Sequence, residues 1–265
     1  MKPTNILEVR DLRVWFPVKK GIFGRIAGHV KAVDGVSFEL RRGETLGLVG
    51  ESGSGKSTVA RAILGLNRPN AGEIVFNGED RRQWSNLEYH RKVQVVFQDP
   101  LSSLNPRHTI LEALTEGPVY HKLCRPEDRR ARALALLESV GLSPAALDRF
   151  PHEFSGGERQ RICIARAMAL EPELLICDEA VSALDLSIRA QILDLLQGLK
   201  ARYGLSLLFI THDIGVVQHV ADRVLVMHKG RIVESGSCSE VLKAPKEAYT
   251  RALIAAVPKI GKALV

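Results

Sequence analysis

The stretch "GESGSGKST", residues 50–58, constrains this chain more than any other feature of its sequence. It fits the pattern Gly-x-x-x-x-Gly-Lys-Ser, and it lies between the apolar run "ETLGLV" and the helical pattern "STVARAILGL". Glycines in such a turn let backbone N–H groups point at phosphate oxygens, and the N-terminus of the following helix adds a positive partial charge. We therefore predict a phosphate-binding loop (P-loop) at one edge of a β-sheet.

Two side chains of this loop have specific roles under that hypothesis. Lys56 supplies a positive charge to the β- and γ-phosphates of a nucleotide, and the Ser57 hydroxyl binds Mg²⁺. A chance glycine-rich turn is the alternative, and the polar residues described next argue against it. The whole loop is expected to contact the nucleotide: Gly50, Glu51, Ser52, Gly53, Ser54, Gly55, Lys56, Ser57 and Thr58.

Polar residues also end three other apolar runs. "LLICDE" ends in Asp178 and Glu179, "LLFITHD" contains His212, and "VVFQ" ends in Gln98. Parallel strands place their carboxyl ends at one edge of a sheet, so we expect these side chains near the P-loop. Asp178 would then lie beside Mg²⁺, and Glu179 would accept a proton from the water that attacks the γ-phosphate. His212 would contact the γ-phosphate, and Gln98 would bind Mg²⁺ or that water; ordinary strand-end residues are the alternative for each.

The rest of the pattern favours an α/β fold. Apolar strands that alternate with helices indicate a mostly parallel sheet covered on both faces. "NILEVRDLRVWF" and "KAVDGVSFEL" predict two more strands, with an exposed loop over residues 17–30 between them. "GEIVFNGED" predicts a strand that ends in an Asn-Gly turn, and "DRVLVMHKGRIVESG" predicts a hairpin that turns at Lys229 and Gly230.

A middle segment differs from these alternating elements. Residues 99–154 show helical patterns such as "PEDRRARALALLESVGLS" and no strand pattern. We therefore expect a single domain over residues 1–265, with a helical lobe at about 99–154 inserted into a core of residues 1–98 and 155–265.

Composition excludes several classes of protein. The 265 residues are 45% hydrophobic and 25% charged, and no window approaches the ~18 apolar residues of a membrane span. The start "MKPTNILEVRDLRV" lacks the pattern of a signal peptide, so a cytoplasmic location is expected. The net charge is +7, but the basic residues are scattered and no aromatic residues interleave with them, so nucleic acid is not an expected partner. The cysteines form no C-x-x-C pair, and neither a metal nor a disulfide role is expected for them: Cys124, Cys163, Cys177 and Cys238.

The order of these motifs resembles that of ATP-binding cassette (ABC) ATPases over nearly the whole chain. The motifs are the P-loop, Gln98, "SGGE", "LLICDE", "SALD" and "THD". In similar proteins two cassettes stack head to tail, and each ATP is held by the P-loop of one and by the signature turn of the other. That turn is Ser155, Gly156, Gly157 and Glu158 here, and it opens a predicted helix, which is itself suited to an anion.

The same resemblance implies roles for two further positions. Asp185 in "SALDLS" would report across the dimer interface, and an aromatic residue after the first strand would stack on adenine. Phe16 is preferred for the adenine contact over its neighbour Trp15, although strand alternation does not decide between them.

Two departures from the family pattern stand beside these roles. Glu158 stands where glutamine is commonest, and a carboxylate is locally favourable near a helix N-terminus. Ala180 and Val181 replace the usual Pro-Thr pair, but Glu179 is present, so hydrolysis is expected.

Longer stretches resemble the dipeptide/oligopeptide/nickel importer subfamily, notably "VFQDPLSSLNPR" and "APKEAYTRALIAAVP". This implies an ATP-hydrolysing subunit at the cytoplasmic face of the inner membrane. Its partners would be two transmembrane permease subunits, a second ABC ATPase (identical or different), and indirectly a solute-binding protein. The helical lobe would face the permease, with Gln98 coupling ATP to it. Peptides are the favoured solute; nickel or another small solute, an exporter role, or a nucleic-acid-linked ABC ATPase are the alternatives.

Overall fold

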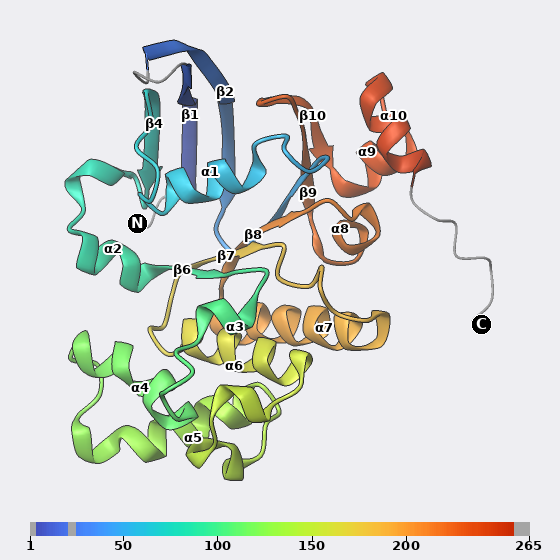
Figure 1. Ribbon diagram of the computed structural model, residues 1–265. Coiled ribbons are helices and arrows are strands. Elements are labelled where there is room, and N and C mark those ends of the chain that lie inside the picture. Colours follow the sequence, from blue (N-terminus) through green and yellow to red (C-terminus); the bar gives the residue numbers. More distant parts are fainter. Residues whose placement is uncertain (1–3, 21–24, 257–265) are drawn as a thin grey trace, which may run out of the picture.

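A computed structural model of the chain describes residues 4–20 and 25–256. Two β-sheets and the helices around them form successive layers, with a group of helices at the end opposite the N-terminal sheet (Figure 1). The larger sheet has the strand order β10-β9-β3-β8-β7-β6. Its strands are β3 (Thr45–Val49), β6 (Val93–Val96), β7 (Leu174–Asp178), β8 (Ser206–Thr211), β9 (Arg223–His228) and β10 (Arg231–Ser237).

The pairing in this sheet confirms the predicted α/β class. β6, β7, β8, β3 and β9 pair in parallel, and β10 alone pairs antiparallel, through the hairpin at Lys229 and Gly230. Both turn residues have positive φ, 46° and 81°, as a tight hairpin turn requires. All five parallel strands therefore have their carboxyl ends at one edge.

The second sheet is antiparallel, with the order β2-β1-β4-β5. Its strands are β1 (Asn5–Lys20), β2 (Arg25–Arg41), β4 (Ala71–Phe76) and β5 (Glu79–Asp80). The predicted loop over residues 17–30 is wrong, because β1 continues to Lys20 and β2 begins at Arg25; residues 21–24 of that prediction lie outside the described chain. Strand β1 pairs with β4 only as far as Arg13, so at Pro17 it has a neighbour on one side, where proline is tolerated.

Ten α-helices are present in the described residues, with short 3-10 turns at 81–83, 126–128, 144–148 and 151–153. Three were not expected from the sequence, namely α2, α8 and α9, each of only six or seven residues. The helices are α1 (Lys56–Ile63), α2 (Asn86–Lys92), α3 (Pro100–Ser103), α4 (Ile110–Tyr120), α5 (Arg129–Ser139), α6 (Gly156–Met168), α7 (Leu186–Tyr203), α8 (Ile214–Val220), α9 (Cys238–Lys243) and α10 (Ala248–Ala255).

The strands of the larger sheet are buried on both faces. In β7, Leu174 and Ile176 join the core shared with α1 and the antiparallel sheet, whereas Leu175 and Cys177 join the core shared with α6 and α7. This is the two-residue period of a strand, with apolar side chains on each face. Helix α1 accordingly lies between the two sheets, and α6 and α7 cover the other face (Figure 1).

Residues 97–155, all of which the structure describes, contain helices and turns and no strand. Helix α4 begins with a capping box, in which the Glu112 N–H donates to Thr109 Oγ1 and the Glu112 carboxylate accepts from the Thr109 N–H. Buried Leu114 and Leu137 from α4 and α5 join Ile162 of α6 in one core. The segment thus packs on α6, and its status as a separate lobe stays a prediction.

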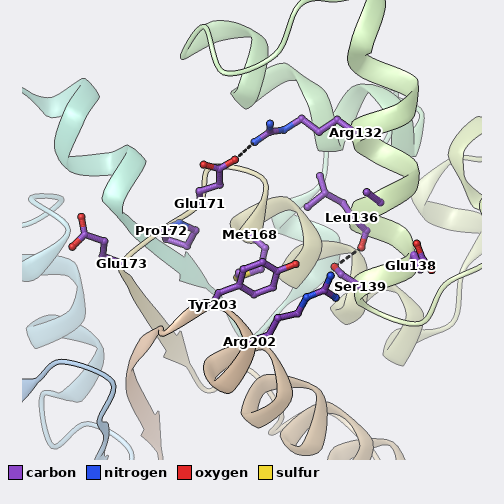
Figure 2. A pocket seen from close by; sticks show the side chains of 11 residues that line it. Arg132, Leu136, Glu138, Ser139, Met168, Glu171, Pro172, Glu173, Arg202 and Tyr203 are labelled. Atoms are coloured by element: carbon purple, nitrogen blue, oxygen red, sulfur yellow. Dashed lines mark hydrogen bonds and ion pairs between the residues drawn. The ribbon is translucent and has the colours of Figure 1, made fainter.

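A cavity of about 800 Å³ lies near the amino ends of β7 and β8, between α5 and the ends of α6 and α7 (Figure 2). Leu136, Met168 and Tyr203 line it together with an ion pair between Arg132 and Glu171, 2.7 Å long. Its lining in the described chain includes none of the predicted site residues.

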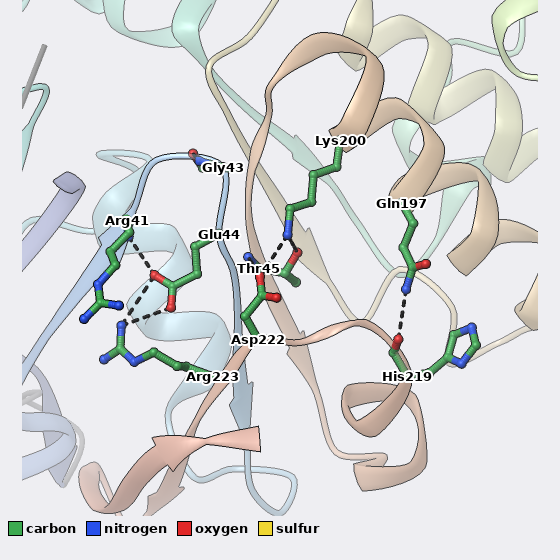
Figure 3. Close-up of polar contacts among 10 residues, drawn as sticks. Arg41, Gly43, Glu44, Thr45, Gln197, Lys200, His219, Asp222 and Arg223 are labelled. Carbon is green, nitrogen blue, oxygen red and sulfur yellow. Dashed lines mark hydrogen bonds and ion pairs between the residues drawn. The ribbon is translucent and has the colours of Figure 1, made fainter. Parts of the chain in front are cut away.

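Polar contacts tie the same amino edge together (Figure 3). Arg223 Nη1 lies 3.1 Å from the buried carboxylate of Glu44. Lys200 Nζ donates to Thr45 Oγ1 and to Asp222 Oδ2, both at 2.9 Å, and Asp222 also accepts the Thr45 N–H at 2.8 Å. These contacts join the starts of β3 and β9 to the end of α7, and the opposite, carboxyl edge carries the polar residues considered next.

Candidate nucleotide-binding site

The P-loop runs from the end of β3 to the start of α1, as the sequence predicts. Gly55 has φ +110°, and a Cβ at this position would lie 2.1 Å from the carbonyl oxygen of Ala32. Gly50 is similarly confined, since its Cβ would lie 2.1 Å from the carbonyl oxygen of Met227. The loop therefore passes against β2 and β9 so closely that only glycine fits at these two positions.

Lys56 is the first residue of α1, and its side chain is buried beneath the loop. Its Nζ donates to the carbonyl oxygens of Gly50 and Glu51, at 2.8 and 2.9 Å. Burial lowers the pKa of Lys56, while the nearby carboxylates of Glu179 and Asp178 oppose that shift. An ammonium group has three donors, so one N–H is left to reach a phosphate oxygen.

Ser57 and Asp178 meet at the carboxyl end of β7. Ser57 Oγ donates to Asp178 Oδ1 at 3.0 Å, and Asp178 as a residue is only 7% exposed. Burial raises the pKa of Asp178, the charge of Glu179 raises it further, and the hydrogen bond from Ser57 lowers it. A buried carboxylate beside a hydroxyl offers two hard oxygen ligands, which is the donor chemistry that Mg²⁺ prefers.

Glu179 follows directly and has an unusual backbone conformation. Its φ is +54°, in the left-handed region, and its N–H donates to the carbonyl oxygen of Ile210 on β8 at 2.9 Å. The Glu179 side chain is 15% exposed, and Oε2 lies 2.7 Å from His212 Nδ1. Such strain in a residue other than glycine costs about 1–3 kcal/mol and is concentrated at functional sites. Ala180 and Val181, which follow, are buried in the core shared with α6 and α7.

Four of the predicted residues share one cavity. It has a volume of about 490 Å³ at the carboxyl edge, and Ser57, Gln98, Asp178 and Glu179 all line it. Gln98 was expected to end its strand, but β6 ends at Val96 and Gln98 lies in the connection to α3. The remaining lining residues were not predicted: Arg61, Phe97, Asp99, Ser102, Ser103 and Arg166.

Two of those unpredicted residues are basic. Arg61 lies one turn after Ser57 on α1, so its helical spacing from the P-loop was a usable signal. Arg166 lies on α6 and donates to the Ser103 carbonyl oxygen, a contact between elements for which the sequence carries no local signal.

The signature turn caps α6. Ser155 is the N-cap residue: its Oγ accepts the Glu158 N–H at 3.3 Å and donates to Glu158 Oε2 at 2.7 Å, while its own N–H donates to that carboxylate at 2.9 Å. These contacts lower the pKa of Glu158. Glutamate at this position therefore completes a capping box. Among the described residues that line the 490 Å³ cavity, none belongs to this turn.

Asp185 has a comparable place at the start of α7. Its Oδ1 accepts the Ile188 N–H at 2.9 Å and the Ser187 hydroxyl at 2.9 Å, and these hydrogen bonds lower the pKa of Asp185. The residue is exposed, and its place at a dimer interface stays a prediction.

The two candidate adenine-stacking residues differ in exposure. Phe16 is 42% exposed on β1, opposite Val30 of β2. Trp15 is partly buried, and Lys31 Nζ lies 4.8 Å from its ring centroid. Ala32, the residue after Lys31 on β2, contacts the P-loop at Gly55, so the paired strands β1 and β2 run beside the loop. Of the two rings, that of Phe16 is more exposed and therefore more accessible for stacking.

Comparison with known proteins decides the family. Residues 33–182 match the family described as ABC transporter. The chain belongs to this family.

Its relatives include transporter subunits. It is 48% identical to the oligopeptide transport ATP-binding protein AppF of Bacillus subtilis (strain 168), over 97% of this chain and 80% of that protein. It is 51% identical to OppF of Salmonella typhimurium, an oligopeptide transport ATP-binding protein, over 96% and 78%. It is also 51% identical to the glutathione import ATP-binding protein GsiA of Escherichia coli (strain K12), over 96% of this chain but 41% of that longer protein. These names confirm the predicted resemblance to the peptide importer subfamily.

Solved ABC cassettes have the same fold. The structure of cbiO1 from Clostridium perfringens, part of the ABC transporter complex cbiONQ, aligns with a TM-score of 0.76 at 29% identity, over 90% of this chain and 91% of that one. The dimeric cassette MJ0796 bound to ADP and Pi aligns with a TM-score of 0.76 at 27% identity, over 88% and 98%. The ABC chain is thus an ATP-binding cassette and an ATPase, as predicted. In the part that the structure describes, no helix has the length and hydrophobicity needed to cross a bilayer.

Proposed function

We propose that this chain is the ATP-hydrolysing subunit of a membrane importer for peptides. The observation that supports this most is the 48–51% identity to oligopeptide transport ATP-binding proteins over almost the whole chain. The similarity to a glutathione importer, whose name also specifies a peptide, agrees with that solute class. Import of nickel or another small solute is the second candidate, because the sequence pattern is common to that subfamily.

Within this function the P-loop, Lys56 and Ser57 hold the phosphates of ATP. Mg²⁺ would be held by Ser57 and Asp178, whose oxygens already lie 3.0 Å apart, with Gln98 on the wall of the same cavity. When bound, Mg²⁺ neutralises charge on the phosphate oxygens. In the described residues no group of three or more His, Cys, Asp or Glu could hold a metal, so phosphate and water oxygens would complete the ligand set.

Glu179 is the proposed general base. Its carboxylate accepts a proton from the water that attacks the γ-phosphate, and His212, 2.7 Å away, holds that carboxylate in place and contacts the γ-phosphate. Gln98 orients the water from the cavity wall. Phe16 stacks on adenine from β1, beside the loop.

Two cassettes would complete each site. Ser155, Gly156, Gly157 and Glu158 form an exposed or half-exposed turn at the N-terminus of the 13-residue helix α6. The capping box uses the N–H groups of Ser155 and Glu158, so those of Gly156 and Gly157 are the ones that would bind an anion. They would bind the γ-phosphate of ATP held by a second cassette, and Asp185 would face the same interface. Hydrolysis then removes the contact and lets the pair open.

The proposed assembly contains this chain, a second ABC ATPase and two transmembrane permease subunits, and receives its solute from a binding protein outside the membrane. The chain would lie on the cytoplasmic face, with residues 99–154 against the permease. This lobe lies beside Gln98, so a change around the γ-phosphate could reach the permease through it.

The test is ATP-driven uptake by the purified complex in lipid vesicles. Labelled oligopeptide and nickel are offered separately, and peptide uptake that depends on ATP is expected.

Lys56→Ala should lose nucleotide binding, whereas Glu179→Gln should keep binding and lose turnover by about 100-fold or more, the scale of general-base catalysis. Glu138→Gln, at the distant cavity of Figure 2, is the matched control and should resemble the wild type. Wild-type turnover no higher than that of Glu179→Gln, or uptake of nickel alone, would contradict the proposal.

A further inference from the structure

The C-terminal helix touches the P-loop. Tyr249, the second residue of α10, accepts a hydrogen bond on its hydroxyl from the backbone N–H of Glu51 at 3.0 Å. The two residues are 198 positions apart in the sequence. Tyr249 also lies outside residues 33–182, the segment that matches the family description.

The phenol ring of Tyr249 packs against His228 and a cluster of apolar residues. Its centroid lies 3.9 Å from that of His228, the last residue of β9. Tyr249 and Leu253 pack against a buried cluster that contains Val226 and Val49, and Val49 directly precedes Gly50. The ring is therefore fixed on the same strands that carry the loop, and its hydroxyl has a defined position relative to Glu51.

Helix α10 is in turn anchored at its N-terminus. The Glu234 carboxylate on β10 accepts the N–H of Lys246 at 2.8 Å and that of Glu247 at 3.1 Å. Arg251 Nη1 donates to the carbonyl oxygens of Pro245 and Lys246, at 3.1 and 2.6 Å. The entry to the helix is thus tied to the hairpin of β9 and β10.

That hairpin makes a second contact with the outside of the loop. The N–H of Gly230 donates to the Ser54 carbonyl oxygen at 2.9 Å. Two hydrogen bonds therefore hold the backbone of the first half of the P-loop: one joins Glu51 to Tyr249, and the other joins Ser54 to Gly230. Backbone N–H groups bind phosphate well only when they are held in the bound geometry beforehand.

We propose that Tyr249 is a positioning residue for the nucleotide, which supports the P-loop through the Glu51 N–H and thereby sets the affinity for ATP and ADP. The inference rests on the proposed function of the P-loop. Because the contact supports the loop and not one particular phosphate, it affects the two nucleotides alike. It also gives the stretch "APKEAYTRALIAAVP" a role in the nucleotide site.

The test is Tyr249→Phe, which removes the hydroxyl and keeps the ring on His228. We expect the Kd values for ATP and for ADP, measured by titration calorimetry, to rise together by about five-fold, the size of one hydrogen bond. KM for ATP should rise with them, while kcat stays at the wild-type value. Tyr203→Phe, which removes a hydroxyl from the distant cavity of Figure 2, is the control and should change neither.

A second variant and a stability measurement separate positioning from folding. Tyr249→Leu removes ring and hydroxyl and should raise both Kd values at least as much. A lower Tm with unchanged Kd values in both variants would overturn the proposal, and so would a fall in kcat at unchanged Kd. If Tyr249→Phe binds ATP normally while Lys56→Ala abolishes binding, the role of Tyr249 is overturned and the proposed function of the P-loop is upheld. If the wild type itself does not bind ATP, the role of Tyr249 and the proposed function are both overturned.

Discussion

His212 Nδ1 lies 2.7 Å from Glu179 Oε2, and the two residues follow the neighbouring parallel strands β8 and β7. The carboxylate is mostly buried, whereas the imidazole is 55% exposed. This contact therefore joins the mostly buried carboxylate of Glu179, whose φ is +54°, to the exposed imidazole of His212. Under the proposed function, this contact would hold Glu179 in the geometry that proton transfer requires.

Replacement of His212 should separate turnover from binding. In His212→Ala, kcat should fall by about 100-fold, the scale for the loss of one aligned polar group, while the Kd for ATP changes little because Lys56 and the loop remain. Steady-state ATPase assays and calorimetric titrations of the same preparation measure both. His219→Ala, an exposed histidine on α8, is the control. A large loss of affinity with normal turnover would contradict the role given to His212.

Asp178→Asn should stabilise the protein in the absence of nucleotide. Burial raises the pKa of Asp178 above its ordinary value of 3.8, so the folded state binds this proton more tightly than the unfolded state does. Ionisation at neutral pH therefore costs folding free energy, and the cost disappears as the pH falls toward 3.8. The variant should have a higher Tm at pH 7, by about 2–4 °C for each kcal/mol gained.

Thermal unfolding at several pH values checks this prediction. The advantage of Asp178→Asn should shrink from pH 7 toward pH 4, and the variant should lack ATPase activity throughout. Glu79→Gln changes an exposed carboxylate on β5, so its Tm should follow that of the wild type. A Tm for Asp178→Asn below that of the wild type at pH 7 would show that the carboxylate stabilises the fold.

Phe16→Ala should weaken the binding of ATP but not of a phosphate chain without a base. A stacked base contributes about 1–3 kcal/mol, so the Kd for ATP should rise by about five-fold or more. Inorganic triphosphate should compete equally well in variant and wild type. Trp15→Ala should instead lower the Tm, since that ring is partly buried under Lys31. The reverse pattern would assign adenine to Trp15.

The residues at the carboxyl edge could be predicted because each follows a short apolar run of sequence. Parallel pairing brings such strand ends together whatever the distance in sequence, and Ser57, Asp178 and Glu179 accordingly line one cavity. The prediction that Gln98 ends its strand is wrong by two residues, because nothing in "VVFQ" distinguishes Gln98 from the strand.

The length of β1, the short helices and the contacts of the C-terminal helix were not predicted from the local sequence pattern. The exposed loop predicted over residues 17–30 is instead part of β1 and β2, and Pro17 fits there because a strand with a neighbour on one side tolerates proline. The short helices α2 and α9 carried an available signal, since Ser85 with Glu88 and Ser237 with Glu240 have the spacing of a capping box. The contact of Tyr249 with Glu51 has no such signal, because it joins elements far apart in the chain.

An experimental structure of the ATP-loaded importer complex, carrying Glu179→Gln to prevent hydrolysis, tests the central claim most directly. The claim is that the P-loop of one cassette and the signature turn of another enclose each ATP. The measured quantity is the distance from Ser155 Oγ to the nearest γ-phosphate oxygen. We predict a hydrogen bond to the ATP held by the neighbouring cassette. A signature turn that faces solvent, with no nucleotide of the neighbour within reach, would contradict the account.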